Sequence, residues 1–284
     1  MEPAMAKMLP DGRRLHCHHG PIDLIIEVFG AGRQQAYDLA VARFETVLEE
    51  LVAELPMLRA GASPSTPFEG PVARRMQRAV QPFLPRFVTP MAAVAGAVAD
   101  EVLGAITTAN GVDKAYVNNG GDVAFFLAPG QQIDAAIAAS DGGTITISSG
   151  DPFRGVATSG WRGRSHSLGI ADAVSAVAEH AAAADVAATL IANAIDLPGH
   201  PAIRRAPAED LSPDSDLGAQ LVTTNVGPLA EDEIRLALDR GAALASAFHE
   251  EGLIGAAALM LAGEVRVVGA RNFQLQQSGA LIDA

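Results

Sequence analysis

The segment from Lys114 to Leu127 places the firmest constraint on the fold. Two runs of strand-forming residues, 114–117 and 123–127, flank the sequence Asn118-Asn119-Gly120-Gly121-Asp122. Asn-Gly and Gly-Asp are favoured pairs in tight hairpin turns, so the segment predicts two strands that pair through the glycines. A fold that contains this segment contains antiparallel sheet.

The remaining patterns mix helix and strand without strict βαβ alternation, which favours the α+β class. Apolar periodicity or small-residue composition predicts helices at 34–55, 91–109, 181–195 and 230–250. Strands are expected at 15–29 and 143–148, with a hairpin of 253–261 and 264–268, while 170–177 fits either a strand or a helix. Polar or glycine-rich stretches at 61–71, 155–169 and 198–217 are expected to be connections.

Composition narrows the classes of partner. The 284 residues are 49% hydrophobic, and the formal net charge of -13 repels nucleic acids and anionic membrane surfaces. The single cysteine, Cys17, excludes an intrachain disulfide and a cysteine-cluster metal site. Residues 1–14 lack the apolar core of a secretory signal and are expected to form a flexible tail, and the apolar run at 253–263 is too short to span a bilayer. We therefore expect a cytoplasmic protein that binds neither nucleic acid nor membranes.

Asp185 and Thr189 form a candidate magnesium site. Their i, i+4 spacing in a predicted helix places both side chains on one face, where both present hard oxygen ligands. The alternative is an Asp near a helix start with a Thr that bonds back to the helix backbone.

Two glycine-containing segments are candidate phosphate sites. The glycines between Asn118 and Asp122 could let backbone amides approach a phosphate, and a plain hairpin turn is the alternative. The segment 158–164, Thr-Ser-Gly-Trp-Arg-Gly-Arg, suits a phosphate beside a flat ring, and a solvated loop anchored by Trp161 is the alternative.

Two further motifs are interpreted as structural elements that do not form a binding or catalytic site. Gly30-Ala31-Gly32-Arg33-Gln34-Gln35-Ala36 matches a dinucleotide fingerprint, but no second parallel strand follows, so we interpret it as a turn into a helix. The histidines around Cys17 alternate between the two faces of a strand, which indicates a polar edge strand. The sequence contains no G-x-S-x-G elbow, Walker A motif or H-E-x-x-H motif.

Three motifs taken together resemble a known family. Val117-Asn118-Asn119-Gly120-Gly121-Asp122, Ala157-Thr158-Ser159-Gly160 and Ala184-Asp185-Val186-Ala187-Ala188-Thr189, in this order, are similar to motifs of the ApbE flavin transferases, which move FMN from FAD onto a protein Ser or Thr. The resemblance runs from about His16 to Leu261 and points to a cytoplasmic, functionally uncharacterised branch of that superfamily. It implies a T-fold-related α+β architecture of sheet and helix layers, as a single compact domain over residues 15–284.

The resemblance also implies site residues. Asp185 and Thr189 would bind magnesium, and the hairpin motif and the Thr-Ser-Gly motif would contact FAD. Arg162 or Arg164 could clamp a phosphate, and His166 or Asp172 could act as the base. The implied cofactor-binding residues are Asn119, Gly120, Gly121, Asp122, Thr158, Ser159, Gly160, Arg162 and Arg164.

The implied activity is magnesium-dependent FAD binding, with FMN transfer to a hydroxyl acceptor such as an acceptor protein, or FAD pyrophosphate cleavage. Two alternatives stay open: a flavin-binding protein without catalysis, and an enzyme or binder that acts on another heterocycle such as a pterin or purine. The small-residue helix at 91–109 is compatible with internal packing or with a homo-oligomer interface.

Overall fold

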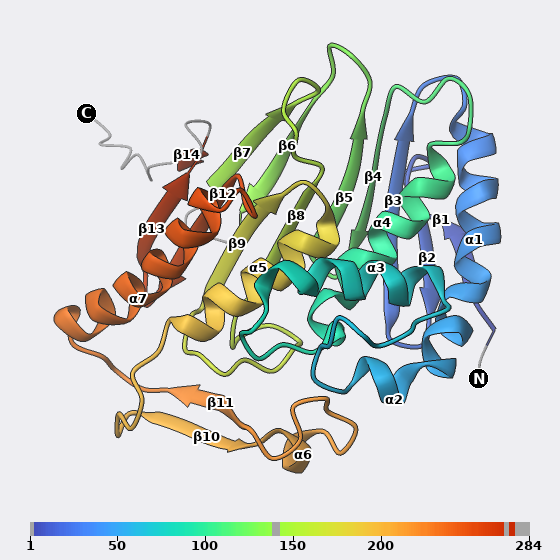
Figure 1. The fold of residues 1–284 in the computed structure, drawn as a ribbon. Helices are drawn as coiled ribbons and strands as arrows, with labels where there is room; N and C mark the ends of the chain where they lie inside the picture. Colours follow the sequence, from blue (N-terminus) through green and yellow to red (C-terminus); the bar gives the residue numbers. More distant parts are fainter. Residues whose placement is uncertain (1–2, 138–142, 270–272, 276–284) are drawn as a thin grey trace, which may run out of the picture.

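The computed structural model describes residues 3–137, 143–269 and 273–275, and a nine-stranded sheet forms its centre (Figure 1). Every neighbouring pair of strands in this sheet is antiparallel. In spatial order the strands are β1 (Met5–Met8), β2 (Leu15–His19), β3 (Ile22–Phe29), β4 (Lys114–Asn119), β5 (Asp122–Leu127), β8 (Gly155–Ser159), β9 (Ala173–Ala178), β12 (Ala256–Leu261) and β13 (Glu264–Gly269). The prediction of the α+β class is confirmed.

Helices cover one face of this sheet, and Figure 1 shows α1, α4, α5 and α7 across it. Helix α3 packs on α4 and α5. The helical segments are α1 (Arg33–Ala53), α2 (Leu55–Leu58), α3 (Pro71–Val80), η1 (Gln81–Phe83), η2 (Pro90–Ala93), α4 (Val94–Ile106), α5 (Ala181–Ala194), α6 (Ala208–Leu211) and α7 (Glu231–Glu250). The small-residue helix expected at 91–109 is η2 with α4, and it packs internally against α1, α3 and α5.

A second, three-stranded sheet, ordered β14-β7-β6, accompanies the main one. Its strands are β6 (Gln132–Ile137), β7 (Gly143–Ser148) and β14 (Phe273–Leu275). Ile145 and Ile147 of β7 share a buried cluster with Phe125 and Leu127 of β5, whereas Ala124 of β5 belongs to the core beneath the helices. Strand β5 is thus buried on both faces, which places its first residue, Asp122, inside the molecule.

The turns follow from their residues. Gly120 and Gly121 adopt φ angles of 66° and 116° and join β4 to β5, with Asn119 paired to Asp122. Positive φ at both central residues defines the favoured two-residue hairpin turn. The predicted hairpin near the C-terminus is also present, and its turn lies at Ala262 and Gly263.

Three expectations were wrong in detail. Residues 5–8 of the expected tail pair with β2 as strand β1. The expected loop at 155–169 begins with β8, an inner strand of the sheet. The expected connection at 198–217 contains β10 (Ile203–Pro207) and α6, and β10 pairs with β11 (Leu221–Val226) to form a two-stranded sheet near one end of α5 (Figure 1). The two-way prediction at 170–177 resolves as strand β9.

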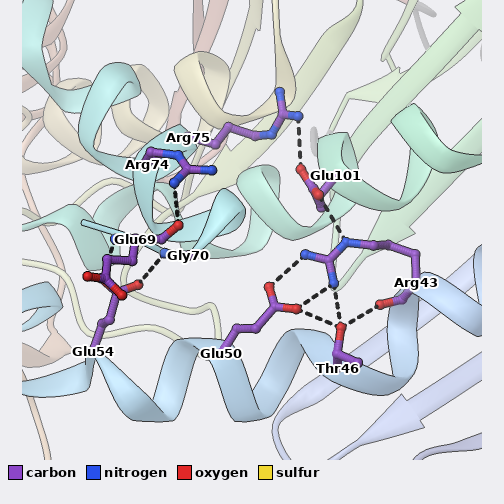
Figure 2. Close-up of polar contacts among 9 residues, drawn as sticks. All are labelled: Arg43, Thr46, Glu50, Glu54, Glu69, Gly70, Arg74, Arg75 and Glu101. Atoms are coloured by element: carbon purple, nitrogen blue, oxygen red, sulfur yellow. Dashed lines mark hydrogen bonds and ion pairs between the residues drawn. The ribbon is translucent and has the colours of Figure 1, made fainter.

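A charged network joins three helices (Figure 2). Arg43 of α1 donates to Glu50 on its own helix and to Glu101 of α4, at 2.7 and 2.9 Å. Arg75 of α3 donates to the other oxygen of Glu101 at 3.0 Å. Glu101 therefore holds α1 and α3 against α4.

No helix among the described residues has the length and apolar character that a membrane crossing requires.

Candidate functional site

The polar side chains of α5 lie in one line. The helix consists of alanine, valine, leucine and isoleucine apart from Asp185, Thr189 and Asn193, which follow one another at intervals of four residues. Such spacing places them on one face, and all three line a single cavity of about 320 Å³. The common face predicted for Asp185 and Thr189 is present.

Helices α4 and α5 hold each other through their aspartates. Asp185 Oδ2 on α5 accepts the Gly96 amide of α4 at 3.1 Å. In return, Asp100 of α4 accepts the amides of Ala181 and Ala182, at 3.1 and 2.9 Å, where α5 begins. The first amides of a helix have no partner within it, so each aspartate satisfies amides in the first turn of the other helix. This exchange fixes Asp185 beside the start of α4.

Asp122 approaches Asp185 from the sheet. It directly follows the Gly120-Gly121 turn, and its Oδ1 accepts the Thr158 amide of β8 at 3.1 Å. Because inner strand β5 is fixed on both sides, this carboxylate has little freedom to move away from α5. Two aspartates that lie 63 residues apart in the sequence thus meet in one cavity.

Burial and mutual repulsion dominate the electrostatics of these carboxyls. Burial raises the pKa of Asp122 to about 7, against the lowering effects of the Thr158 amide and of Arg164. Burial, followed by the nearby charge of Asp122, raises the pKa of Asp185 well above its ordinary value. Asp185 itself is half-buried and lines the cavity. A cation or a proton placed between these groups would relieve the repulsion.

The other walls of the cavity are polar as well. Arg164 and His166 reach it from the segment after β8. Thr89, which donates to Asp216, and two serines from the segment that follows α6 also line it. The lining residues are Phe87, Val88, Thr89, Met91, Ala92, Val94, Ala95, Asp122, Arg164, Ser165, His166, Leu168, Asp185, Thr189, Leu190, Asn193, Ser212, Ser215, Asp216 and Leu217.

The structure brings five of the predicted site residues to this cavity and leaves the others outside it. Asp122, Arg164, His166, Asp185 and Thr189 line it. The residues outside it are Asn119, Gly120, Gly121, Thr158, Ser159, Gly160, Arg162 and Asp172.

Asn119 and the glycines of the hairpin line neighbouring grooves. Asn119 lines a mainly apolar groove of about 680 Å³, and its Nδ2 donates to the Ala95 carbonyl at 3.1 Å. Gly120, Gly121 and Thr158 line a groove of about 710 Å³ together with side chains from β4, β5 and β6. The hairpin therefore separates this groove from the cavity that contains Asp122.

Asp172 is engaged away from the cavity. Its Oδ1 accepts hydrogen bonds from the side chains of Trp161 and Arg162, at 3.2 and 2.5 Å, and its Oδ2 accepts the Ala262 amide at 2.6 Å. These contacts anchor the segment directly after β8, which begins at Gly160, to the β12–β13 turn. Of the two predicted bases, only His166 lines the cavity.

Sequence reasoning missed Asn193, Thr89 and the serines near Asp216. The signal for Asn193 was present, because it continues the four-residue spacing of Asp185 and Thr189 in a helix with no other polar residue. Thr89 and Asp216 lie 127 residues apart, and no local pattern predicts their contact.

The donor set suits magnesium better than a transition metal. Within the described residues, no cluster of three or more His, Cys, Asp or Glu side chains is arranged to hold a metal. Two aspartates and a threonine hydroxyl remain, and hard oxygen donors of this kind are typical of magnesium sites completed by substrate phosphates. The Thr189 hydroxyl makes no hydrogen bond with any described residue, so the alternative in which it bonds back to the helix does not apply.

The fold and the cavity define an α+β protein whose carboxylate-lined cavity lies where a helix pair meets a sheet hairpin. A family model described as "AbpE bacteria" matches residues 6–267, and the chain therefore belongs to this family. The predicted ApbE-like membership is confirmed.

The chain is also similar to individual proteins of known sequence and to a solved structure. A UPF0280 protein of Methanopyrus kandleri is 36% identical over 160 residues, 54% of this chain and 62% of the relative. A UPF0280 protein of Methanothrix thermoacetophila is 33% identical over 163 residues, 55% of this chain and 67% of the relative. The first match thus spans less than two thirds of the relative. The crystal structure of Pseudomonas stutzeri flavinyl transferase ApbE in its apo form is 10% identical, with a TM-score of 0.44 and 96% of each chain covered.

Proposed function

We propose that the cavity binds FAD with magnesium and supports FMN transfer to a hydroxyl acceptor, or cleavage of the FAD pyrophosphate by water. One observation carries the proposal: the buried Asp122 of β5 and the half-buried Asp185 of α5 meet beside the Thr189 hydroxyl in a cavity that Arg164 and His166 also line. Membership of the "AbpE bacteria" family supports the flavin assignment.

Magnesium would be held by Asp185, Asp122 and Thr189. When bound, the ion neutralises the charge that develops on the phosphates during transfer. The raised pKa values of the two aspartates agree with this role, because neither carboxylate has a cationic partner strong enough to offset burial.

Arg164 and His166 would bind the phosphates and transfer a proton. The Arg164 guanidinium presents donors that match phosphate oxygens. The acceptor hydroxyl forms a bond to the FMN phosphorus, the bond from that phosphorus to the AMP oxygen breaks, and AMP leaves. His166 takes the proton of the acceptor hydroxyl, a role for which an imidazole near pH 7 is suited.

The apolar groove beside the cavity provides space for a flat ring. It shares Met91, Val94, Ala95, Arg164 and Ser165 with the phosphate cavity, and its other lining is mainly leucine, isoleucine and valine. Concave apolar sites with a few placed polar groups are typical of cofactor binding. Cavity and groove together can hold a ligand longer than either alone.

The test is incubation of the purified protein with FAD and magnesium, followed by chromatography for AMP and FMN. The proposal predicts AMP release that requires magnesium and is lost in Asp185→Asn but kept in the control Asp239→Asn, which changes an exposed aspartate of α7. AMP without free FMN would indicate transfer of FMN to a hydroxyl of the protein itself, the one protein in the reaction, and equal AMP and FMN would indicate hydrolysis. Binding of FAD without AMP release would instead favour the flavin-binding protein. Absence of FAD binding would refute the proposal and favour another heterocycle such as a pterin or purine.

A further inference from the structure

Asn193 is the third polar side chain of the α5 line, and metal binding does not account for it. Its Oδ1 accepts the Leu168 amide at 2.9 Å and the Ser167 hydroxyl at 3.3 Å. A backbone amide can only donate, so the oxygen of the Asn193 side chain must face Leu168. The nitrogen of the side chain must then occupy the other position.

These hydrogen bonds fix the segment that carries His166. Ser167 is buried, and its carbonyl accepts the Thr223 amide of β11 at 2.8 Å. The segment is therefore tied to α5 on one side and to β11 on the other. His166 immediately precedes these attachments and lines the cavity, so its position depends on Asn193.

The other end of the Asn193 amide remains available. Asn193 lines the cavity, and its Nδ2 makes no hydrogen bond with any residue that the structure describes. This nitrogen is not one of the buried unpaired atoms, which are His19 Nδ1, Arg75 Nε and Thr223 Oγ1, so it keeps accessible surface. Eight residues of helix separate Asp185 from Asn193, which corresponds to about 12 Å along the axis at about 1.5 Å per residue. The cavity therefore has oxygen ligands for a cation at one end and a hydrogen-bond donor at the other.

We propose that Asn193 is a positioning and recognition residue of this cavity. Its Oδ1 holds the segment that carries His166, and its Nδ2 donates a hydrogen bond to an oxygen or ring-nitrogen acceptor of the ligand. The phosphates of that ligand lie at Asp185, which is the part of the inference that rests on the proposed function. The ligand class is an elongated phosphate ester with an acceptor about 12 Å from its phosphates, and inorganic pyrophosphate is too short to reach both ends.

Two substitutions separate the two roles. Asn193→Asp keeps oxygens that can accept from Leu168 and Ser167 but removes the donor. Asn193→Ala removes both without adding a charge. Asn225→Asp is the control for the added charge, because Asn225 is an exposed residue of β11 that does not line the cavity.

The experiment is calorimetric titration of each variant, with magnesium, using FAD and inorganic pyrophosphate as probes. Loss of one hydrogen bond of about 1.4 kcal/mol corresponds to a tenfold change in affinity. We expect Asn193→Ala to bind FAD at least tenfold more weakly but to bind pyrophosphate like the wild type. Asn193→Asp should also lose FAD affinity, and Asn225→Asp should keep it. Unchanged FAD affinity in Asn193→Ala would overturn the recognition role.

Hydrogen exchange tests positioning without any ligand. The Leu168 amide should exchange at least tenfold faster in Asn193→Ala and near the wild-type rate in Asn193→Asp. Equal exchange in wild type and Asn193→Ala would overturn the positioning role. If the wild type binds pyrophosphate but not FAD, the flavin assignment fails. If it binds neither probe, the phosphate site itself fails, and recognition by Asn193 fails with it.

Discussion

The packing of α4 against α5 predicts opposite effects for the same substitution at two glycines of one helix. A Cβ on Gly96 would lie 2.3 Å from the Ala181 carbonyl oxygen and 2.4 Å from its carbon, whereas a Cβ on Gly104 would meet no atom within 4 Å. Both residues lie inside α4. The comparison therefore holds helix propensity constant and changes only the contact with α5.

The magnitudes follow from these contacts. Gly104→Ala should stabilise the protein by about 0.5–1 kcal/mol, the usual gain from replacing glycine in a helix. Gly96→Ala receives the same gain but forces backbone atoms of α5 to move, and overpacking of this kind costs about 1–3 kcal/mol. The clash involves backbone, which cannot rotate away, so we expect the upper part of that range. The displacement would also lengthen the Asp185–Gly96 hydrogen bond of 3.1 Å.

Urea denaturation followed by circular dichroism measures the difference. The substitutions should shift the urea concentration at the midpoint of unfolding and leave the dependence of the unfolding free energy on urea concentration unchanged. The gain in helix propensity is common to both variants and cancels, so they should differ by about 2–3 kcal/mol, with Gly96→Ala the less stable. Equal stabilities would refute the close packing of α4 on α5 and, with it, the account of how Asp185 is positioned.

Three further predictions concern stability and reactivity. Asp100→Ala leaves two buried amides of α5 without acceptors, at about 1–3 kcal/mol each, so thermal unfolding should occur several degrees lower. Burial raises the pKa of Glu101, but hydrogen bonds and charges from Arg43 and Arg75 outweigh it and leave the pKa below its ordinary value. The contribution of Glu101 to the free energy of unfolding is therefore complete above the unfolded pKa of about 4.3 and is lost as pH falls through the folded value. Urea denaturation at several pH values should show that Glu101→Gln loses less stability on acidification than the wild type does. An identical loss in both proteins would contradict the ion pairs. Burial raises the pKa of Cys17 to about 12, so a thiol reagent at pH 8 should label the protein only after denaturation, and rapid labelling of the native protein would contradict this burial.

The sequence predicted the elements whose pattern is local. The alanine-rich composition of α5 and the four-residue spacing of Asp185 and Thr189 located one wall of the site. The Gly-Gly pair located the hairpin that delivers Asp122. Both depend only on helix and turn geometry, which a few neighbouring residues determine.

The elements that were missed depend on distant contacts. Strand β8 was expected to be a loop because glycines punctuate it, but Gly155 serves close packing: a Cβ there would lie 2.2 Å from the Ala181 nitrogen at the start of α5. The cavity wall that contains Ser212 and Asp216 belongs to a segment rich in proline and polar residues, whose place is set by its contact with Thr89. Neither packing partner can be found from local sequence.

The most direct test of the central claim is the magnesium dependence of FAD binding, measured by titration calorimetry on the wild type, Asp185→Asn and Asp239→Asn. If Asp185, Asp122 and Thr189 hold the ion beside the FAD phosphates, magnesium should strengthen FAD binding in the wild type and in Asp239→Asn but not in Asp185→Asn. FAD binding that is indifferent to magnesium in the wild type, or equally enhanced in Asp185→Asn, would contradict the claim.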